Sequence, residues 1–289
     1  MAEKFRGFIN NLAVENQDAI NERVKSIARA INQQYWHMKS ETRNIHLLGS
    51  YGRDTAIKGL ENINLLVVLP GDVYKRFEKR GDHGQTALML EVRESINHIS
   101  RDTHFTSEGC LMIPLDNNKL EIEIIPGFFT PKKNILYPES HQGWRWAEFN
   151  PLREMEAIDE YNFKYGGKIK HLAKMMRAWR RHYQAPIPGM LIDTLVMNFM
   201  DDWEGHSTSF AYYGFMCADF LEYLAGLKKE QLVWYAKGSN RKISRSEDFG
   251  IQADQAFKKA RIALRHEREG DHYNANRVWK TVFGELFPM

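Results

Sequence analysis

The hydrophobic pattern of this chain changes its period near residue 150, and this change limits the possible folds more than any other feature of the sequence. Before it, short apolar runs such as Ile63–Leu69 stop at turn-forming residues, which is typical of strands. After it, apolar residues recur at the spacing of one helix face. The stretches with this spacing are 151–164, 167–184, 190–203, 209–226 and 251–269. The sequence therefore predicts a mixed α/β first half and an all-helical second half.

The first half is predicted to begin with a long N-terminal helix that could pack on either half of the protein. A second helix is expected at 85–99, and Asp116–Asn118 has the composition of a turn. Strands are predicted at 45–48, 63–69, 110–114 and 120–125. The stretch Pro126–Pro151 is rich in Pro, Trp and Gly and is predicted to be a loop. We place the domain boundary in this loop, which gives domains of 1–150 and 151–289.

The composition excludes several classes of protein. The chain has 40 Lys and Arg against 37 Asp and Glu, so its formal net charge is 40 − 37 = +3, unlike that of a histone-like polycation or an acidic tail. Hydrophobic residues make up 43% of the chain, which is enough for a buried core. Two cysteines fit a reducing compartment, and no signal peptide or membrane-spanning run is evident. We therefore expect a cytoplasmic protein that has no membrane partner.

The chain turns at Gly49–Ser50, directly after the first predicted strand. Glycine lets the backbone approach a ligand closely, and a serine hydroxyl beside free backbone N–H groups suits an anion such as a triphosphate. Arg53 could add a charge-assisted contact to that anion, or it could hold the loop in place. Gly–Ser alone favours a plain strand–turn–helix corner without a ligand, but the residues that follow at 62 favour a phosphate site.

Polar residues lie on two of the predicted strands at the spacing that a metal site uses. Polymerase-type nucleotidyl transfer needs two divalent metals, and Mg²⁺ prefers carboxylate oxygens. Asp-x-Asp on a strand supplies two carboxylates to one face, because side chains alternate with period 2. Here Asn62-Ile63-Asn64 opens one strand and Glu121-Ile122-Glu123 opens another. The sequence therefore has the frame of such a site, with amides at two of its positions.

Three segments, LLGSYGRDTAI, NINLLVVLP and LEIEIIPGF, follow one another along the chain and resemble the bacterial relatives of cyclic GMP–AMP synthase. These relatives are cyclic-oligonucleotide synthases of anti-phage signalling systems, in the polymerase-β-like nucleotidyltransferase superfamily. Two later segments, GGKIKHLAKMMRAWRRHYQAPIPGMLIDTL and RVWKTVFGELFP, resemble the helical domain and the closing element of the family. The resemblance covers nearly the whole chain, and the three motifs together are much more specific than any one alone.

The resemblance implies an α+β, bilobal fold. A polymerase-β-like nucleotidyltransferase lobe with a mixed sheet would be joined to an all-helical lobe that closes the nucleotide cleft. The implied substrates are nucleoside triphosphates, the cofactors are two Mg²⁺ or Mn²⁺ ions in the active form, and the product is a cyclic or short linear oligonucleotide second messenger. The messenger would act on a downstream effector in an infected bacterial cell, and a nucleic acid or a protein could serve as activator. Gly49, Ser50 and Arg53 match the nucleotide-binding turn.

One departure from the family pattern is central. The family has Asp-x-Asp where this chain has Asn62 and Asn64, and the third catalytic and metal-binding carboxylate falls on Glu123, where many members have Asp. An amide oxygen can touch a metal ion but brings no negative charge. We therefore predict that the chain as written is catalytically inactive or severely weakened.

Two explanations for the asparagines are open. Both changes are the minimal isosteric one and the neighbouring motif is intact, which favours a deliberate D-to-N replacement over a natural pseudoenzyme. Two rival functions are also open. One is nucleotidyl transfer onto RNA or a protein, and the other is binding of a nucleotide or RNA without catalysis, which the asparagines support.

Basic residues form a stripe between residues 168 and 181, where the chain has no acidic residue. Lys170, Lys174, Arg177 and Arg181 follow spacings of 4, 3 and 4 and so share one helix face. Such a face suits a triphosphate or a nucleic-acid backbone, although on an isolated helix it is more often solvated surface. The resemblance adds that a basic residue of this helix reaches the donor triphosphate, and Lys174 and Arg177 match that position best.

Two weaker signals lie further along the chain. Tyr212 and Tyr213 could stack on a base or could be core aromatics. The basic segment 237–245 is predicted to be irregular, and it could bind a nucleotide or RNA or be a solvated loop.

Overall fold

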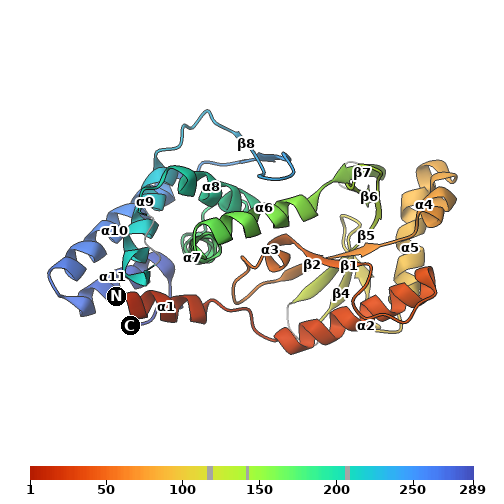
Figure 1. Cartoon of the computed structure of the whole chain (residues 1–289), viewed down its shortest axis with the longest axis horizontal. Helices are drawn as coiled ribbons and strands as arrows, with labels where there is room; N and C mark the ends of the chain where they lie inside the picture. The colour runs from red at the N-terminus through yellow and green to blue at the C-terminus, as the bar shows by residue number, and fades with distance from the viewer. Residues whose placement is uncertain (116–119, 141–142, 206–208) are drawn as a thin grey trace. The chain divides into compact units, whose positions relative to one another are not determined.

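The computed structural model describes residues 1–115, 120–140, 143–205 and 209–289, and it divides the chain into two compact units. The sheet unit contains residues 15–52 and 59–152. The helical unit contains residues 1–14, 53–58 and 153–289. The chain therefore does not follow the simple order of domains 1–150 and 151–289, because its first 14 residues and the short segment 53–58 belong with the helices (Figure 1).

A mixed sheet is the centre of the sheet unit. Its order is β1-β2-β5-β4-β3, and β6 and β7 extend it from β5. The strands are β1 (Ile45–Leu48), β2 (Asn62–Val68), β3 (His104–Phe105), β4 (Leu111–Pro114), β5 (Glu121–Phe129), β6 (Ile135–Glu139) and β7 (Arg145–Phe149). The pair β2 and β5 is parallel and the other pairs are antiparallel. On β2, Ile63 and Leu65 are fully buried, so the alternation along the strand sends Asn62 and Asn64 to the opposite face.

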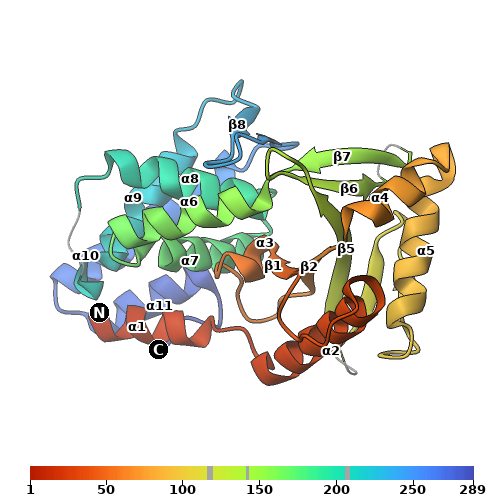
Figure 2. The same ribbon diagram turned by 45° about the vertical axis from the view of Figure 1, so that its right-hand side comes forward.

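Helices pack on the buried side of this sheet. The helices of the sheet unit are α2 (Gln17–Trp36), α3 (Gly49–Gly52), α4 (Gly71–Glu78), the 3-10 turn η1 (Gly81–His83) and α5 (Gly84–Ile96). The helices α2 and α5 pack against each other at an angle (Figure 2). Their apolar faces are buried, with Ile27 and Ile31 of α2 and Leu88 and Val92 of α5 fully covered.

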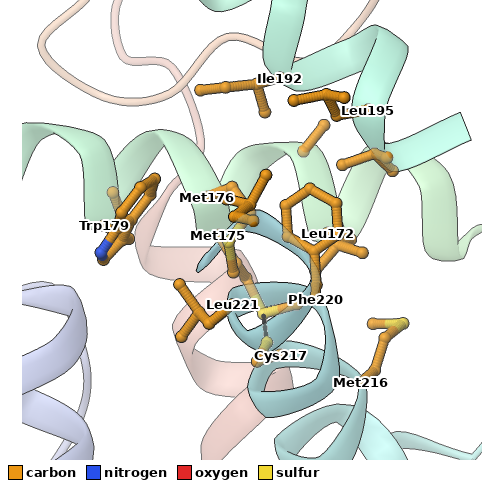
Figure 3. Packing of buried hydrophobic residues seen from close by; sticks show 14 of the residues in the cluster. Leu172, Met175, Met176, Trp179, Ile192, Leu195, Met216, Cys217, Phe220 and Leu221 are labelled. Atoms are coloured by element: carbon orange, nitrogen blue, oxygen red, sulfur yellow. Dashed lines mark hydrogen bonds between the residues drawn. The ribbon is translucent and has the colours of Figure 1, made fainter. Parts of the chain in front are cut away.

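The helical unit is built around α7 (Lys168–Tyr183), which packs against both α8 and α9. The other elements are α1 (Ala2–Asn11), α6 (Pro151–Lys164), α8 (Gly189–Asp202), the 3-10 turn η2 (Phe210–Tyr212), α9 (Tyr213–Ala225), β8 (Val233–Tyr235), β9 (Lys242–Ser244), α10 (Gly250–Arg268) and α11 (His272–Phe283). In the core, Leu172, Met176 and Trp179 of α7 face Ile192 of α8 and Leu221 of α9 (Figure 3). All five side chains are fully buried, which accounts for the apolar periodicity of these stretches.

The predicted long N-terminal helix is wrong, because two helices occupy this stretch. The break falls between α1 and α2, where Asn16 has a left-handed backbone with φ of 58°. The two helices then belong to different units, since Phe5 and Phe8 of α1 pack on aromatic rings of α11 in the helical unit.

The predicted loop from Pro126 to Pro151 is also wrong, because it contains the end of β5 and the strands β6 and β7. These strands are short, and Pro138 lies within β6, so their sequence lacks the long apolar run that marks the central strands. The predicted irregular segment 237–245 is instead part of the hairpin β8–β9. The predicted turn Asp116–Asn118 lies outside the described residues.

In the part of the chain that the structure describes, none of the helices is long and apolar enough to cross a membrane.

Candidate functional site

The parallel pair β2–β5 places the sequence-predicted residues next to one another. In the register of these strands, Asn62 is opposite Glu121 and Asn64 is opposite Glu123. The Asn64 Nδ2 donates a hydrogen bond to Glu123 Oε2 at 2.9 Å. Because side chains two residues apart share a face, all four polar side chains project from the same side of the sheet.

The Gly49–Ser50 turn lies directly against Asn64. Leu48, the last residue of β1, is paired with Asn64 of β2, and α3 begins with the next residue. Gly49 has φ of 65°, and a β carbon added to it would lie 2.7 Å from Asn64 Oδ1. Glycine is therefore required at position 49 for two reasons, its left-handed backbone and its close approach to the candidate catalytic residue.

Two side chains that the sequence analysis did not select border this site. Burial, together with the nearby Glu123 carboxylate, raises the pKa of the Cys110 thiol to about 11, so the sulfur is protonated at neutral pH. His104 Nε2 lies 3.6 Å from Glu121 Oε1. The register of β4 with β5 and of β3 with β4 carries both residues to this face, and no sequence motif marks them.

The donor set on this face does not fit two divalent ions. Among the described residues, no group of three or more His, Cys, Asp or Glu side chains is arranged to hold a metal. Asn62 and Asn64 supply neutral amides, and the Asn64 amide presents an N–H rather than an oxygen to Glu123. Two dications need carboxylates that compensate their charge, and this face offers Glu123 with Glu121 beside it. Aspartates at 62 and 64 would give three carboxylates at the predicted positions.

The helical unit contains a second polar centre, which is buried around Asp193. The Asp193 side chain is fully buried and accepts hydrogen bonds from Arg53 Nε at 2.9 Å and from Arg177 Nη1 at 2.6 Å. Thr55 Oγ1 donates to the same carboxylate at 3.3 Å. Burial alone would raise the pKa of the Asp193 carboxyl, but the guanidinium groups of Arg177 and Arg53 outweigh it and hold the pKa below its usual value. This centre fastens the segment 53–58 to α7 and α8.

Arg53 and Arg177 thus have a partner that the sequence did not reveal. The sequence left two roles open for Arg53, a phosphate contact or support of the loop. In the structure its guanidinium forms an ion pair with Asp193. Arg177 is 7% exposed and also donates to the carbonyl oxygens of Ala173 and Gly189. The nucleotide contacts expected from these two arginines stay predictions.

The remaining cations of the α7 stripe also meet oxygens from other parts of the chain. Lys174 Nζ lies 2.6 Å from Asp54 Oδ1, and Lys170 Nζ lies 2.7 Å from Asp159 Oδ1. Arg181 Nη1 donates to the Lys58 carbonyl oxygen at 2.6 Å. The Asp54 side chain is 63% exposed, whereas that of Lys174 is 16% exposed, so the acid is the accessible member of this pair.

The structure treats Tyr212 and Tyr213 differently. Tyr212 is 48% exposed, whereas Tyr213 is buried and its hydroxyl lies 2.7 Å from His171 Nδ1. Tyr213 is therefore a core aromatic, and Tyr212 keeps a ring face that could stack on a base. Three of the four cations of the segment 237–245 have structural partners. Lys237 pairs with Asp201, Arg241 pairs with Glu154, and Arg245 donates to the carbonyl oxygens of Lys228 and Lys229.

Comparison with known proteins identifies the family. Residues 1–162, more than half of the 289 residues, match the family described as Second Messenger Oligonucleotide or Dinucleotide Synthetase domain. The chain belongs to this family. A curated relative, a probable cyclic nucleotide synthase of Bacillus cereus (strain VD146), is 23% identical over 274 residues, which cover 83% of this chain and 81% of the relative.

Solved structures of similar proteins share the fold of this family member. The Escherichia coli MS115-1 CdnC structure with ATP has a TM-score of 0.70 at 13% identity and covers 99% of this chain and 98% of its own. The Bradyrhizobium diazoefficiens CdnG structure with GTP has a TM-score of 0.67 at 11% identity, covering 98% and 94%. The Vibrio cholerae DncV cyclic AMP-GMP synthase with a linear intermediate has a TM-score of 0.66 at 12% identity, covering 96% and 93%. The predicted polymerase-β-like α+β fold is confirmed.

The chain is thus a member of the nucleotidyltransferase-type cyclic nucleotide synthase family. Within this synthetase, the predicted site residues fall into two groups. The sheet unit holds Gly49, Ser50, Asn62, Asn64 and Glu123, and the helical unit holds Arg53, Lys174, Arg177 and Tyr212.

Proposed function

We propose that this chain has the architecture of a synthase of cyclic or short linear oligonucleotides and that, as written, it is catalytically inactive or severely weakened. The observation that carries this proposal is the contact between Asn64 and Glu123, made on the same sheet face as Asn62 and against the Gly49–Ser50 turn. An amide and a carboxylate satisfy each other at the place where the reaction needs two negative groups free.

The proposed reaction of the aspartate form is attack by a 2′- or 3′-hydroxyl on the α-phosphate of a bound nucleoside triphosphate, with pyrophosphate as the leaving group. Gly49 and Ser50 would place backbone N–H groups and a hydroxyl near the phosphates. Lys174 would add positive charge to the triphosphate, and the half-exposed ring of Tyr212 would stack on a base. Two Mg²⁺ or Mn²⁺ ions, bound by three carboxylates in that form, would supply charge neutralisation and an activated hydroxyl.

The ion pair between Lys174 and Asp54 bears on how the triphosphate would bind. Since Lys174 Nζ contacts the Asp54 carboxylate at 2.6 Å, a phosphate would have to replace this acid or share the lysine with it. Asp54 is mostly exposed, which makes the replacement possible without unpacking the helical unit. Arg53 and Arg177, which pair with buried Asp193, would position the segment that carries Asp54.

The biological role that we propose is production of a second messenger in bacterial defence against phage, with a downstream effector that responds to it. A protein activator is one candidate partner, because the similar CdnC of E. coli MS115-1 has been solved in a complex with HORMA-deltaN. A nucleic acid is the other. We place this activity in the bacterial cytoplasm.

The test is restoration of the carboxylates. The chain as written and its Asn62→Asp/Asn64→Asp variant are incubated with Mg²⁺ or Mn²⁺ and all four labelled ribonucleoside triphosphates. We expect the variant to form at least about 100-fold more labelled oligonucleotide, because charge compensation of bound metals contributes several kcal/mol to such reactions. Asn62→Ala/Asn64→Ala is the matched control and should stay inactive. Equal, negligible product from all three proteins would sink the proposal.

The nature of the product separates the rival enzyme functions. Small nuclease-resistant products support messenger synthesis, whereas label on RNA or on protein supports transfer to a macromolecule. The Asn64–Glu123 contact itself favours a second candidate, a pseudoenzyme that binds nucleotide or RNA without metal. Tight triphosphate binding in EDTA, combined with an inactive double aspartate variant, would establish that candidate. The natural codons at 62 and 64 would decide between replacement and natural divergence.

A further inference from the structure

A basic groove lies on the helical unit between α9 and α10. These two helices pack side by side (Figure 1). Its volume is about 470 Å³. The residues that line it are Phe215, Arg261, Leu264, Arg265, Glu267 and Arg268. None of the candidate nucleotidyl-transfer residues is among them.

The three arginines form one exposed face of α10. Arg261, Arg265 and Arg268 follow spacings of 4 and 3, so they project from the same side of the helix. All three are exposed, and none has an acidic partner among the residues that the structure describes. Glu267, the acid of the groove, instead accepts a hydrogen bond from Trp279 Nε1 at 2.8 Å. With three arginines against one glutamate among its lining residues, the groove carries a net positive charge.

The ring of Phe215 lies beside these arginines, on a helix that is packed closely against α10. Phe215 is 47% exposed, although its neighbours Gly214 and Met216 are buried in the packing of α9. A β carbon added to Gly214 would lie 3.1 Å from Leu264 Cδ2, so this glycine lets α9 approach α10 closely. The ring is thus held at the edge of a well-packed helix pair and is about half exposed to solvent.

We propose that this groove binds single-stranded nucleic acid, with backbone phosphates on Arg261, Arg265 and Arg268 and a base stacked on Phe215. Sites for single strands combine a positively charged track with aromatic stacking platforms, and this groove has both. Arginine and phenylalanine are also enriched in protein interfaces. Three arginines on one helix face, with a single acid among the six lining residues, nevertheless match the cationic surface that binds nucleic acid better. Interfaces with nucleic acid are strongly cationic.

The proposal does not depend on catalysis, so the chain as written is the right material. Fluorescence anisotropy with labelled (dT)15 and (U)15 is measured over a range of salt concentrations. Replacing the arginines in an R261A/R265A/R268A variant should weaken binding at least about tenfold and make the log–log salt slope shallower by about 2, because each neutralised phosphate of a single strand contributes about 0.7. Phe215→Ala should weaken binding about fivefold or more and leave the salt slope unchanged, since it removes stacking alone.

A matched control removes three exposed cations that already have acidic partners. Arg145, Arg153 and Lys258 pair with Glu139, Glu156 and Asp254, and their side chains are 58%, 61% and 71% exposed. The R145A/R153A/K258A variant loses the same charge and should bind the oligonucleotides as the parent does. Thermal unfolding confirms that each variant is folded.

Several outcomes would overturn the proposal. The first is no binding of either single strand at low salt. The second is equal weakening by the arginine variant and the control, which would mean that net charge alone acts. The third is equal affinity for a 15-base-pair duplex. The fourth is displacement of the oligonucleotide by ATP at concentrations that occupy the nucleotide site. Capture of an acidic protein, with no oligonucleotide binding, would identify a protein surface instead.

Discussion

Two helices of the helical unit carry basic residues at nearly the same spacing and use them in opposite ways. On α7 the set is Lys170, Lys174, Arg177 and Arg181, and on α10 it is Arg261, Arg265 and Arg268. Each cation of the α7 set contacts a carboxylate or carbonyl oxygen from another segment. Those of the α10 set are exposed and have no acidic partner in the described ranges. Helical spacing thus decides which cations share a face, and tertiary packing decides whether that face is internal or free.

The largest expected effect on stability comes from removing Asp193, the buried acid that pairs with Arg177 of the α7 set. Asp193→Ala leaves the guanidinium groups of Arg53 and Arg177 buried without a counter-charge. We expect the free energy of unfolding to fall by about 3–5 kcal/mol, as for other broken buried ion pairs. Urea unfolding followed by circular dichroism measures it. Asp54→Ala, which removes the exposed acid of the Lys174 pair, is the control and should cost less than about 1 kcal/mol. Equal effects of the two variants would contradict the difference between buried and exposed pairs.

Low pH should selectively weaken the buried ion pairs that Asp193 makes with Arg53 and Arg177. The pKa of Asp193 is lowered in the folded protein, so its stabilising contribution is complete above its unfolded pKa of about 3.9 and is lost as the pH falls through the folded value. The difference in unfolding free energy between the parent and Asp193→Asn should therefore be constant from pH 7 to about pH 5 and should shrink below about pH 4. A difference that is independent of pH down to pH 2 would show that the carboxylate charge is not responsible.

A smaller effect is expected on nucleotide binding, and this prediction rests on the proposed function. Asp54→Asn removes the acid that contacts Lys174, so ATP should bind up to about fivefold more tightly, which corresponds to the roughly 1 kcal/mol upper value of a partly exposed ion pair. Asp159→Asn is a close match, because Asp159 is also 63% exposed and pairs with Lys170 of the same stripe. Equilibrium dialysis with labelled ATP compares them. If Asp159→Asn tightens binding as much as Asp54→Asn, the gain reflects net charge rather than competition at Lys174.

The smallest effect on stability should come from replacing the arginines of the α10 set. Because its arginines contact no acid in the described structure, the R261A/R265A/R268A variant should lower the free energy of unfolding by less than about 1 kcal/mol in total. The same urea experiment measures it. A loss comparable to that of Asp193→Ala would show that these arginines stabilise the fold, and the comparison between the two helices would then fail.

Much of the fold follows from local sequence patterns. The apolar run Ile63–Leu69 marks the central strand β2, and helical periodicity marks α6, α7, α8 and α10 to within about two residues, because each buries a continuous apolar face. The strands β6 and β7 escape prediction, since short strands at the end of a sheet bury few side chains and carry little pattern. The split between α1 and α2 also escapes it, because both helices are amphipathic and the break depends on which unit each one joins.

The candidate site, like the fold, was predictable from the sequence only in part. The alternation of a strand by itself determined that Asn62 and Asn64 share one face, and the order of the motifs along the chain indicated the family. Only the parallel register of β2 and β5 decided that Asn64 meets Glu123, 59 residues away.

The α7 stripe shows the limit of sequence reasoning most clearly. The chain between 168 and 181 has no acid, so the stripe alone predicts free positive charge. Its partners Asp54 and Asp193 come from other elements, and Asp54 is 120 residues from Lys174. Local spacing fixes which side chains share a face because helix geometry is regular. The acids that meet that face are fixed by long-range packing, which local sequence does not encode.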